Sequence, residues 1–189
     1  EVRKDEDADP LKQYVWSAQY IDAPVVCWRD SDTDGTVDET LGYLTDANMN
    51  VTAVMERAGV ASTDVDERYT YTPYGEGTVY DGSWSGLSAS AYENTIRFCG
   101  YRWDAETGLY HVRNRVYHAP LGRWLQRDPA EKSANLVAYV ENSPVSAGDP
   151  LGLKRYEFTM NIRWDAHHSV PMPSEEVLMG EPSHCGVGR

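Results

Sequence analysis

The chain has 189 residues, enough for one domain with a substantial core and too few for two of ordinary size. Its net charge of −13 argues against binding to nucleic acid or to anionic membrane surfaces, which both require basic patches. No stretch is apolar enough to span a membrane, and no signal peptide opens the chain. It does not begin with Met, so we interpret it as a fragment whose missing signal says nothing about the compartment of its parent.

Strand patterns dominate the first half of the chain. Residues 1–11 form an acidic leader, which we expect to lack regular structure. Strand-like runs follow at 13–20, 24–28, 41–45, 51–57 and 68–72, with turn residues between them. The last run ends in the turn sequence Pro73-Tyr74-Gly75. No helical pattern of any length precedes residue 130, so the sequence predicts an all-β fold.

An acidic loop at Asp30–Glu39 begins with the spacing D-x-D-x-D-G of a calcium-binding loop. Asp30, Asp32 and Asp34 are its candidate ligands. The twelfth position, where such loops carry a bidentate Glu, is Leu41, and flanking helical patterns are absent. We therefore favour an acidic hairpin loop that binds calcium no more tightly than about millimolar.

Cysteines and histidines give no firm metal site. Cys27 and Cys99 lie in apolar strand-like runs, which predicts buried free thiols, and a disulfide between them has no support in the sequence. The tail contains a set of potential zinc ligands: His167, His168, His184 and Cys185. Adjacent histidines point apart and no pair has finger-like spacing, so solvated side chains are the simpler interpretation. No cofactor is predicted.

The stretch 96–127 has the densest succession of strands and turns. Asp104 and Gly108 bound a turn, and residues 119–122 form another before Arg123. Between them the alternation predicts one strand, with Leu109, His111, Arg113, Arg115 and Tyr117 on one face and Tyr110, Val112, Asn114 and Val116 on the other. Further on, residues 134–140 are expected to form one or two helical turns.

Three segments together resemble the core domain at the end of rearrangement-hotspot (RHS), or YD-repeat, proteins: RFCGYRWDAETGLYHVRNRVYHAPLGRWLQRDP, NLVAYVENSP and DPLGL. The unit at 67–75 (ERYTYTPYG) is similar to the repeats that precede this domain. The resemblance implies stacked aromatic β-hairpins of a YD-repeat shell, with a short irregular or helical plug at 128–153. It divides the chain into a leader (1–11), a repeat region (12–95), the core domain (96–153) and a variable tail (154–189).

Many members of this family cut themselves directly after the Leu of the DPxGL motif, by a mechanism attributed to aspartates. Carried onto this chain, the resemblance implies cleavage of the Leu153–Lys154 bond, with Asp149 as one carboxylate. Asp128 supplies a further acid, and Arg123 is the candidate for orienting a carboxylate. Two carboxyl groups held close together cannot both ionise, so one remains an acid while the other activates water.

One departure from the family pattern leaves the catalytic role open. Proteolytic members often carry Asp-Gly before the NLY segment, whereas residues 133–135 are Ser-Ala-Asn here. The nearest acids are Glu131 and Asp128. The alternative is a buried network of Arg123, Asp128 and Asp149 that anchors the plug without catalysis.

The resemblance implies the C-terminal end of a bacterial shell, secreted or at the cell surface, that encloses and presents an effector. The expected partners are the upstream YD repeats of the parent shell and either a C-terminal effector or the surface of a target cell. The alternative is a cell-surface or wall-associated adhesion protein that does not cleave itself. A third hypothesis, a small effector in 154–189, has little support from composition.

Overall fold

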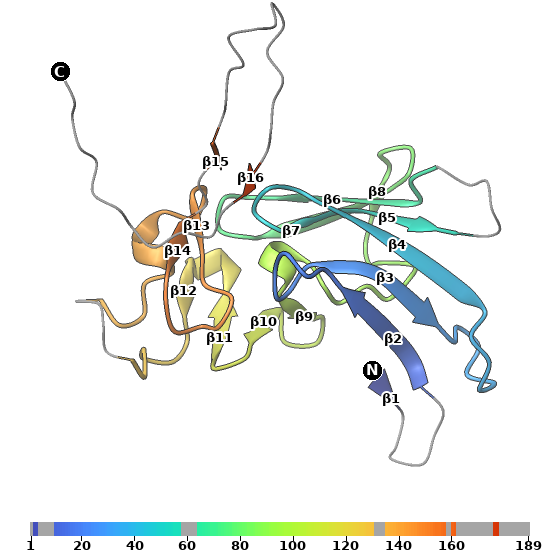
Figure 1. Ribbon diagram of the computed structural model, residues 1–189, viewed down its shortest axis with the longest axis horizontal. Helices are drawn as coiled ribbons and strands as arrows, with labels where there is room; N and C mark the ends of the chain where they lie inside the picture. Colours follow the sequence, from blue (N-terminus) through green and yellow to red (C-terminus); the bar gives the residue numbers. More distant parts are fainter. Residues whose placement is uncertain are drawn as a thin grey trace, which may run out of the picture.

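The computed structural model describes residues 2–3, 10–57, 64–130, 135–157, 160–161 and 176–177. They form antiparallel sheets almost without helix, which confirms the predicted all-β fold. In Figure 1 a long meander, coloured blue to green, lies beside a smaller yellow sheet, and the orange segment packs against that smaller sheet. No helix within these ranges is long and apolar enough to cross a membrane. The histidines and Cys185 of the tail, and most of the leader, lie outside the described residues.

Eight strands follow one another in chain order across the larger sheet, here called the repeat sheet. They are β1 (Val2–Arg3), β2 (Pro10–Trp16), β3 (Pro24–Arg29), β4 (Glu39–Thr45), β5 (Val51–Glu56), β6 (Glu67–Tyr71), β7 (Gly77–Asp81) and β8 (Gly86–Leu87). The five strand-like runs of the sequence correspond to β2 to β6. The leader contributes β1, which pairs with β2 where the sequence indicated no regular structure.

Four strands form the smaller core sheet: β9 (Arg102–Asp104), β10 (Leu109–Val112), β11 (Arg115–His118) and β12 (Arg123–Trp124). The turn between β9 and β10 is the predicted one. The Asp104 carboxylate accepts hydrogen bonds from the Glu106 amide (3.1 Å) and the Thr107 hydroxyl (2.7 Å). Gly108 takes the positive φ of 69° that a side chain would disfavour.

The single strand predicted for residues 109–117 is wrong. A two-residue turn at Arg113 and Asn114 divides it into β10 and β11, which pair Tyr110 with Tyr117 and Val112 with Arg115. Residues directly opposite one another in an antiparallel ladder point to the same face of the sheet. Arg115 therefore shares the buried face with both tyrosines, whereas the single predicted strand placed it on the face opposite Tyr110.

The plug, defined here as residues 135–157, is irregular. Its helical turn is the 3-10 turn η3 (Val140–Asn142), later than the predicted 134–140. The carbonyls of Leu136 and Val137 accept hydrogen bonds from the Asp128 and Trp124 amides, so they are not available to a helix. Two other 3-10 turns, η1 (Phe98–Gly100) and η2 (Ala119–Leu121), flank the core sheet. Short pairs complete the fold: β13 (Ala147–Gly148) with β14 (Tyr156–Glu157), and β15 (Met160–Asn161) with β16 (Glu176–Val177).

Each region has its own hydrophobic core. The repeat sheet buries Cys27, Leu41, Tyr43, Val51, Val54, Tyr69, Val79 and Ile96. The core sheet and plug enclose a mostly aromatic cluster: Phe98, Cys99, Tyr101, Tyr110, Val112, Tyr117, Ala119, Trp124, Tyr139, Val140 and Ala147. Cys27 and Cys99 are buried free thiols, as predicted.

Hydrogen bonds from the aromatic cluster join the two regions at the Pro73-Tyr74-Gly75 turn. The hydroxyl of Tyr110 donates to the Gly75 carbonyl (2.9 Å), and that of Tyr117 donates to the Tyr74 carbonyl (2.7 Å). Each tyrosine thus packs its ring in the core and satisfies its hydroxyl on the neighbouring turn. The turn that ends the repeat unit is therefore one of the places where the core sheet attaches.

Candidate functional site: a buried carboxylate at the DPLGL turn

The DPLGL segment, residues 149–153, forms the tight connection between β13 and β14. The Gly152 amide donates to the Asp149 carbonyl (3.1 Å), and Gly152 has φ of 65°. A Cβ on Gly152 would lie 3.3 Å from the Arg115 backbone nitrogen, so this position requires glycine for both conformation and space. The turn is thereby pressed against the start of β11.

The Asp149 carboxylate lies inside this turn and is only 3% exposed. Its Oδ1 accepts hydrogen bonds from the backbone amides of Leu153 (2.9 Å) and Lys154 (3.0 Å). Its Oδ2 accepts from Nη2 of Arg115 (2.9 Å). The Lys154 nitrogen belongs to the peptide bond that the family resemblance marks for cleavage, so a buried carboxylate contacts that bond directly.

Arg115 is the centre of the site. Its guanidinium is buried and donates from Nε to the Gly152 carbonyl (2.5 Å) and from Nη1 to the Leu136 carbonyl (3.4 Å). It also lies 4.3 Å from the centroid of the Trp124 ring, in a cation–π arrangement. One arginine therefore holds the DPLGL turn, the plug and the aromatic cluster together.

Asp128, which follows β12 and precedes the plug, approaches the same guanidinium. Its Oδ2 lies 3.9 Å from Nη1 of Arg115, and its Oδ1 accepts the Ala130 amide (2.8 Å). Asp128 is 8% exposed, so two buried carboxylates share one buried cation. The structure thus brings together Asp128 and Asp149, while the catalytic role of the pair stays a prediction. Glu131 and residues 133–134 lie outside the described ranges.

Arg123 contacts neither Asp128 nor Asp149 among the described residues, and the orienting role predicted for it stays without support from these contacts. It lies in β12, is exposed, and lines a surface groove of about 460 Å³ beside Tyr74. Among the described residues, the cation that pairs with both carboxylates is Arg115. Sequence reasoning missed Arg115 because it treated residues 109–117 as one strand and placed Arg115 on the face opposite Tyr110 and Val112. The Arg-Asn pair that makes the hairpin turn contains no Gly, so no local signal marked the turn.

Burial and hydrogen bonding act on the Asp149 pKa in opposite directions. Burial raises the pKa of Asp149 above its ordinary value, and the amides of Lys154 and Leu153, with Arg115, offset part of that rise. Tyr101 closes the inner side, since its hydroxyl donates to the Asp149 carbonyl (2.9 Å) and accepts from the Asp149 amide (3.2 Å). A carboxyl group that is held near a peptide nitrogen and protonates more readily than usual is suited to general acid catalysis.

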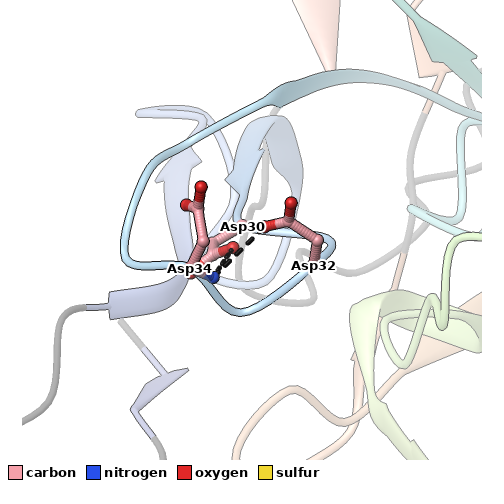
Figure 2. Close-up of side chains that lie close together, drawn as sticks. All are labelled: Asp30, Asp32 and Asp34. Carbon is pink, nitrogen blue, oxygen red and sulfur yellow. Dashed lines mark hydrogen bonds between the residues drawn. The ribbon is translucent and has the colours of Figure 1, made fainter.

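The predicted calcium ligands occupy the hairpin between β3 and β4. Figure 2 shows Asp30, Asp32 and Asp34 gathered there, with dashed lines to the Asp34 backbone nitrogen. The oxygens of Asp30 accept the amides of Asp34 (3.2 Å) and Gly35 (2.9 Å), as in an acidic loop closed by its own backbone. Leu41, at the position of the bidentate ligand, is fully buried in β4. One carboxylate oxygen from each of the three aspartates lies within 4.8 Å of the others, and the weak calcium binding expected of this loop stays a prediction.

No protein-family model matches the chain. Three curated proteins are similar to it in sequence. Salivary gland surface protein 1 of Aedes aegypti is 40% identical over 84 residues, the tRNA3(Ser)-specific nuclease WapA of Bacillus spizizenii 31% over 116 residues, and the toxin protein Tse5 of Pseudomonas aeruginosa 43% over 60 residues. These matches cover 44%, 58% and 31% of the chain, which spans only 2%, 5% and 5% of the respective proteins.

Solved structures of Tc toxins share the fold. The crystal structure of TcdB2-TccC3-Cdc42 matches 68% of the chain with a TM-score of 0.50 and 28% identity. The Tc holotoxin pore of Photorhabdus luminescens, with an aspartate-to-alanine mutation in TccC3, matches 79% with a TM-score of 0.51 and 25% identity. The chain covers 6% and 7% of those chains. It therefore has the fold of a small part of these RHS-containing toxin chains and is similar in sequence to toxin proteins.

Proposed function

We propose that this chain is the C-terminal end of an RHS/YD-repeat shell that encloses and presents a C-terminal effector outside the producing cell, and that it cuts itself after Leu153. The observation that carries the proposal is the contact of the buried Asp149 carboxylate with the amide of the Leu153–Lys154 bond. Its partners are the preceding repeats of the parent shell and the effector that follows the cut.

The delivery role is supported by the toxin relatives and by the architecture. The shared fold lies in Tc toxin chains, and the sequence is similar to segments of a toxin and of a nuclease, each of which extends far beyond the matched region. Among the described residues, β1 and β8 are the edge strands of the repeat sheet, and stacked repeats of a longer shell would cover such edges. The aromatic cluster of the core sheet extends to Ala147, directly before the DPLGL turn.

In the proposed cut, one buried carboxylate accepts a proton and the other donates one. Asp128 takes a proton from a water molecule whose oxygen bonds to the Leu153 carbonyl carbon, and protonated Asp149 gives its proton to the Lys154 nitrogen as the C–N bond breaks. The products are a carboxyl group on Leu153 and an amine on Lys154. Asp149 is the acid because it contacts the leaving nitrogen, and its raised pKa favours the protonated form.

Intact-mass spectrometry of the purified chain, followed over time from neutral to mildly acidic pH, tests the cut. We expect two pieces, one ending at Leu153 and one beginning at Lys154. Asp149→Asn should leave the chain whole, because an amide neither donates this proton nor shares it. Asp128→Asn should slow the cut about a hundredfold or more.

Asp104→Asn is the matched control for these variants, since Asp104 also closes a turn of the core domain with its carboxylate but lies outside the site. It should cut at the wild-type rate. Cleavage that persists in an Asp128→Asn, Asp149→Asn double variant would refute the carboxylate assignment.

A second candidate function is part of a cell-surface protein that does not cleave itself. The match to Salivary gland surface protein 1, at 40% identity, favours it. In that case Asp149 and Arg115 only anchor the plug, and the wild-type chain remains whole under all conditions while Asp149→Asn lowers its stability. The same mass measurement, combined with thermal unfolding of the two chains, separates the two functions.

A further inference from the structure

Three consecutive side chains of the core sheet bind three consecutive carbonyls of the DPLGL turn. Nη1 of Arg113 donates to the Pro150 carbonyl (3.1 Å), and Nδ2 of Asn114 donates to the Leu151 carbonyl (2.8 Å). Nε of Arg115 donates to the next carbonyl, that of Gly152 (2.5 Å). Each donor thus meets the acceptor 37 positions further along the chain, and the series stops one residue before the Leu153–Lys154 bond.

We propose that Arg113, Asn114 and Arg115 form a backbone clamp that positions the Leu153–Lys154 peptide bond against Asp149. The proposal rests on the proposed self-cleavage, and it assigns positioning residues for that reaction. Because the clamp contacts carbonyl oxygens, it holds the chain through its backbone and places no demand on the side chain of Leu151. The clamp does restrict residue 152, because a Cβ at this glycine would lie 3.3 Å from the Arg115 backbone nitrogen.

The clamp is itself held in place from the repeat sheet. The Asp22 carboxylate, in the connection between β2 and β3, accepts both of its hydrogen bonds from Nη1 of Arg113 (2.7 and 2.8 Å). The Asp22 side chain is 12% exposed and that of Arg113 is 42% exposed, so a largely buried carboxylate holds a half-exposed arginine. The position of the peptide bond therefore depends on contact between the repeat sheet and the core sheet.

Fixing the reacting bond within about 1 Å is worth roughly a hundredfold in rate, so loss of one clamp contact should be visible in the cut. Arg113 and Asn114 are the informative positions, because neither touches Asp128 or Asp149. Asn114→Asp keeps the shape of the side chain but replaces the donor with a charged acceptor opposite the Leu151 carbonyl. Arg113→Met removes the donors, and Arg113→Lys restores one donor and the charge.

The rate of self-cleavage of the 189-residue chain, followed by intact mass at one pH, is the first measurement. We expect Asn114→Asp and Arg113→Met to cut about tenfold more slowly than wild type, and Arg113→Lys to recover to within about threefold. The matched control is Asn48→Asp, because Asn48 also donates its side-chain amide to a plug carbonyl, that of Val145 (3.1 Å), but outside the DPLGL turn. It should cut at the wild-type rate. Unchanged cutting in Asn114→Asp and Arg113→Met would overturn the clamp.

If the wild-type chain does not cut, amide hydrogen exchange still tests the clamp. The proposed self-cleavage then fails, but the clamp still predicts that the Leu153 and Lys154 amides, both bonded to Asp149, exchange about tenfold faster in Asn114→Asp and Arg113→Met than in Asn48→Asp. Equal exchange in all three variants would show that the clamp does not position this bond. A global loss of structure is recognised by faster exchange throughout the repeat sheet as well.

Discussion

The most deeply buried carboxylates of the repeat sheet and of the plug are stabilised in different ways. Glu67, at the start of β6, is 1% exposed, and Asp149 is 3% exposed. Glu67 accepts hydrogen bonds from neutral donors only among the described contacts: the Tyr69 hydroxyl, the Ser90 hydroxyl (2.8 Å) and the Ala91 amide (2.5 Å). Asp149 instead combines two backbone amides with the guanidinium of Arg115.

This difference in donors distinguishes a carboxylate that joins two segments of the fold, Glu67, from one that lies in the candidate functional site, Asp149. The donors around Glu67 come from β6 and from the segment after β8, so the carboxylate fastens two parts of the repeat sheet. The donors around Asp149 include the amide of a peptide bond next to a cation that is shared with a second carboxylate. Replacing a carboxylate that accepts only from neutral donors with a neutral group costs a modest amount of folding free energy. Removing one partner of a buried ion pair costs more, because the other charge is left buried without a partner.

The largest expected effect follows from removing the shared cation. Arg115→Met should lower the free energy of unfolding by about 3–5 kcal/mol, because it leaves two buried carboxylates without their cation and the Gly152 carbonyl without its donor. Urea unfolding measures the loss. Arg123→Met, at an exposed arginine of the neighbouring strand, should stay within about 0.5 kcal/mol of wild type. A loss under about 1 kcal/mol for Arg115→Met would contradict the central role of this residue.

A second effect concerns the junction of the two regions. Gly100→Ala should cost about 2–4 kcal/mol, because the new Cβ would lie 2.0 Å from the Asp22 carbonyl oxygen and the backbone has φ of 71°. The matched control is Gly86→Ala in β8, where a Cβ meets no atom within 4 Å. Thermal unfolding of the two variants compares them, and equal melting temperatures would show that the β2–β3 connection does not pack against Gly100.

A change at Glu67, which accepts hydrogen bonds from neutral donors, should lower the free energy of unfolding less than the loss of Arg115. Glu67→Gln keeps one acceptor oxygen but sets an amide group against donors that include the Ala91 amide, so we expect a loss of about 1–3 kcal/mol. Glu76→Gln, at an exposed position of the turn before β7, serves as the control. If Glu67→Gln destabilised the chain as strongly as Arg115→Met in the same urea titration, the distinction between the two regions would not hold.

The sequence predicted the repeat sheet well because its signals are local. Alternation within short runs and turn residues between them determine β2 to β6, and Asp104 with Gly108 determines the turn before β10. The buried carboxylates Asp128 and Asp149 were also found, since the family resemblance points to them directly. The inward alternation of β10 was likewise readable, with Tyr110 and Val112 on one face.

The arginine of the site could not be assigned for a geometric reason. Side chains alternate along a strand, but a two-residue hairpin turn resets the alternation, so Val112 and Arg115 share a face although three positions separate them. The Arg113-Asn114 turn lacks the Gly that usually marks such hairpins, and nothing in the local pattern distinguishes it from a continuing strand. The contacts of the clamp, between residues 37 positions apart, are tertiary and have no local signal.

The smallest expected effect is a pH dependence at the place where the two regions meet. Burial raises the pKa of Asp22 above its ordinary 3.8, and Arg113 offsets only part of the rise. The folded chain then binds a proton at Asp22 more readily than the unfolded chain, so protonation favours folding. Relative to Asp22→Asn, the wild type should gain stability as pH falls from about 7 through the folded pKa, and the gain should level off below 3.8.

Asp104→Asn provides a control of opposite sign for this measurement. The hydroxyl of Thr107 and the amide of Glu106 lower the pKa of Asp104, so the wild type should lose stability relative to Asp104→Asn as pH falls through 3.8 toward the folded pKa. Urea unfolding of the three chains at a series of pH values gives both differences. The Asp22 difference should remain below the losses expected for Arg115→Met and Gly100→Ala, because Arg113 already compensates part of the burial. If the stability of the wild type relative to Asp22→Asn instead falls on acidification, the ion pair with Arg113 outweighs burial. The pKa of Asp22 would then be lowered, like that of Asp104, and not raised, like that of Asp149 in the plug.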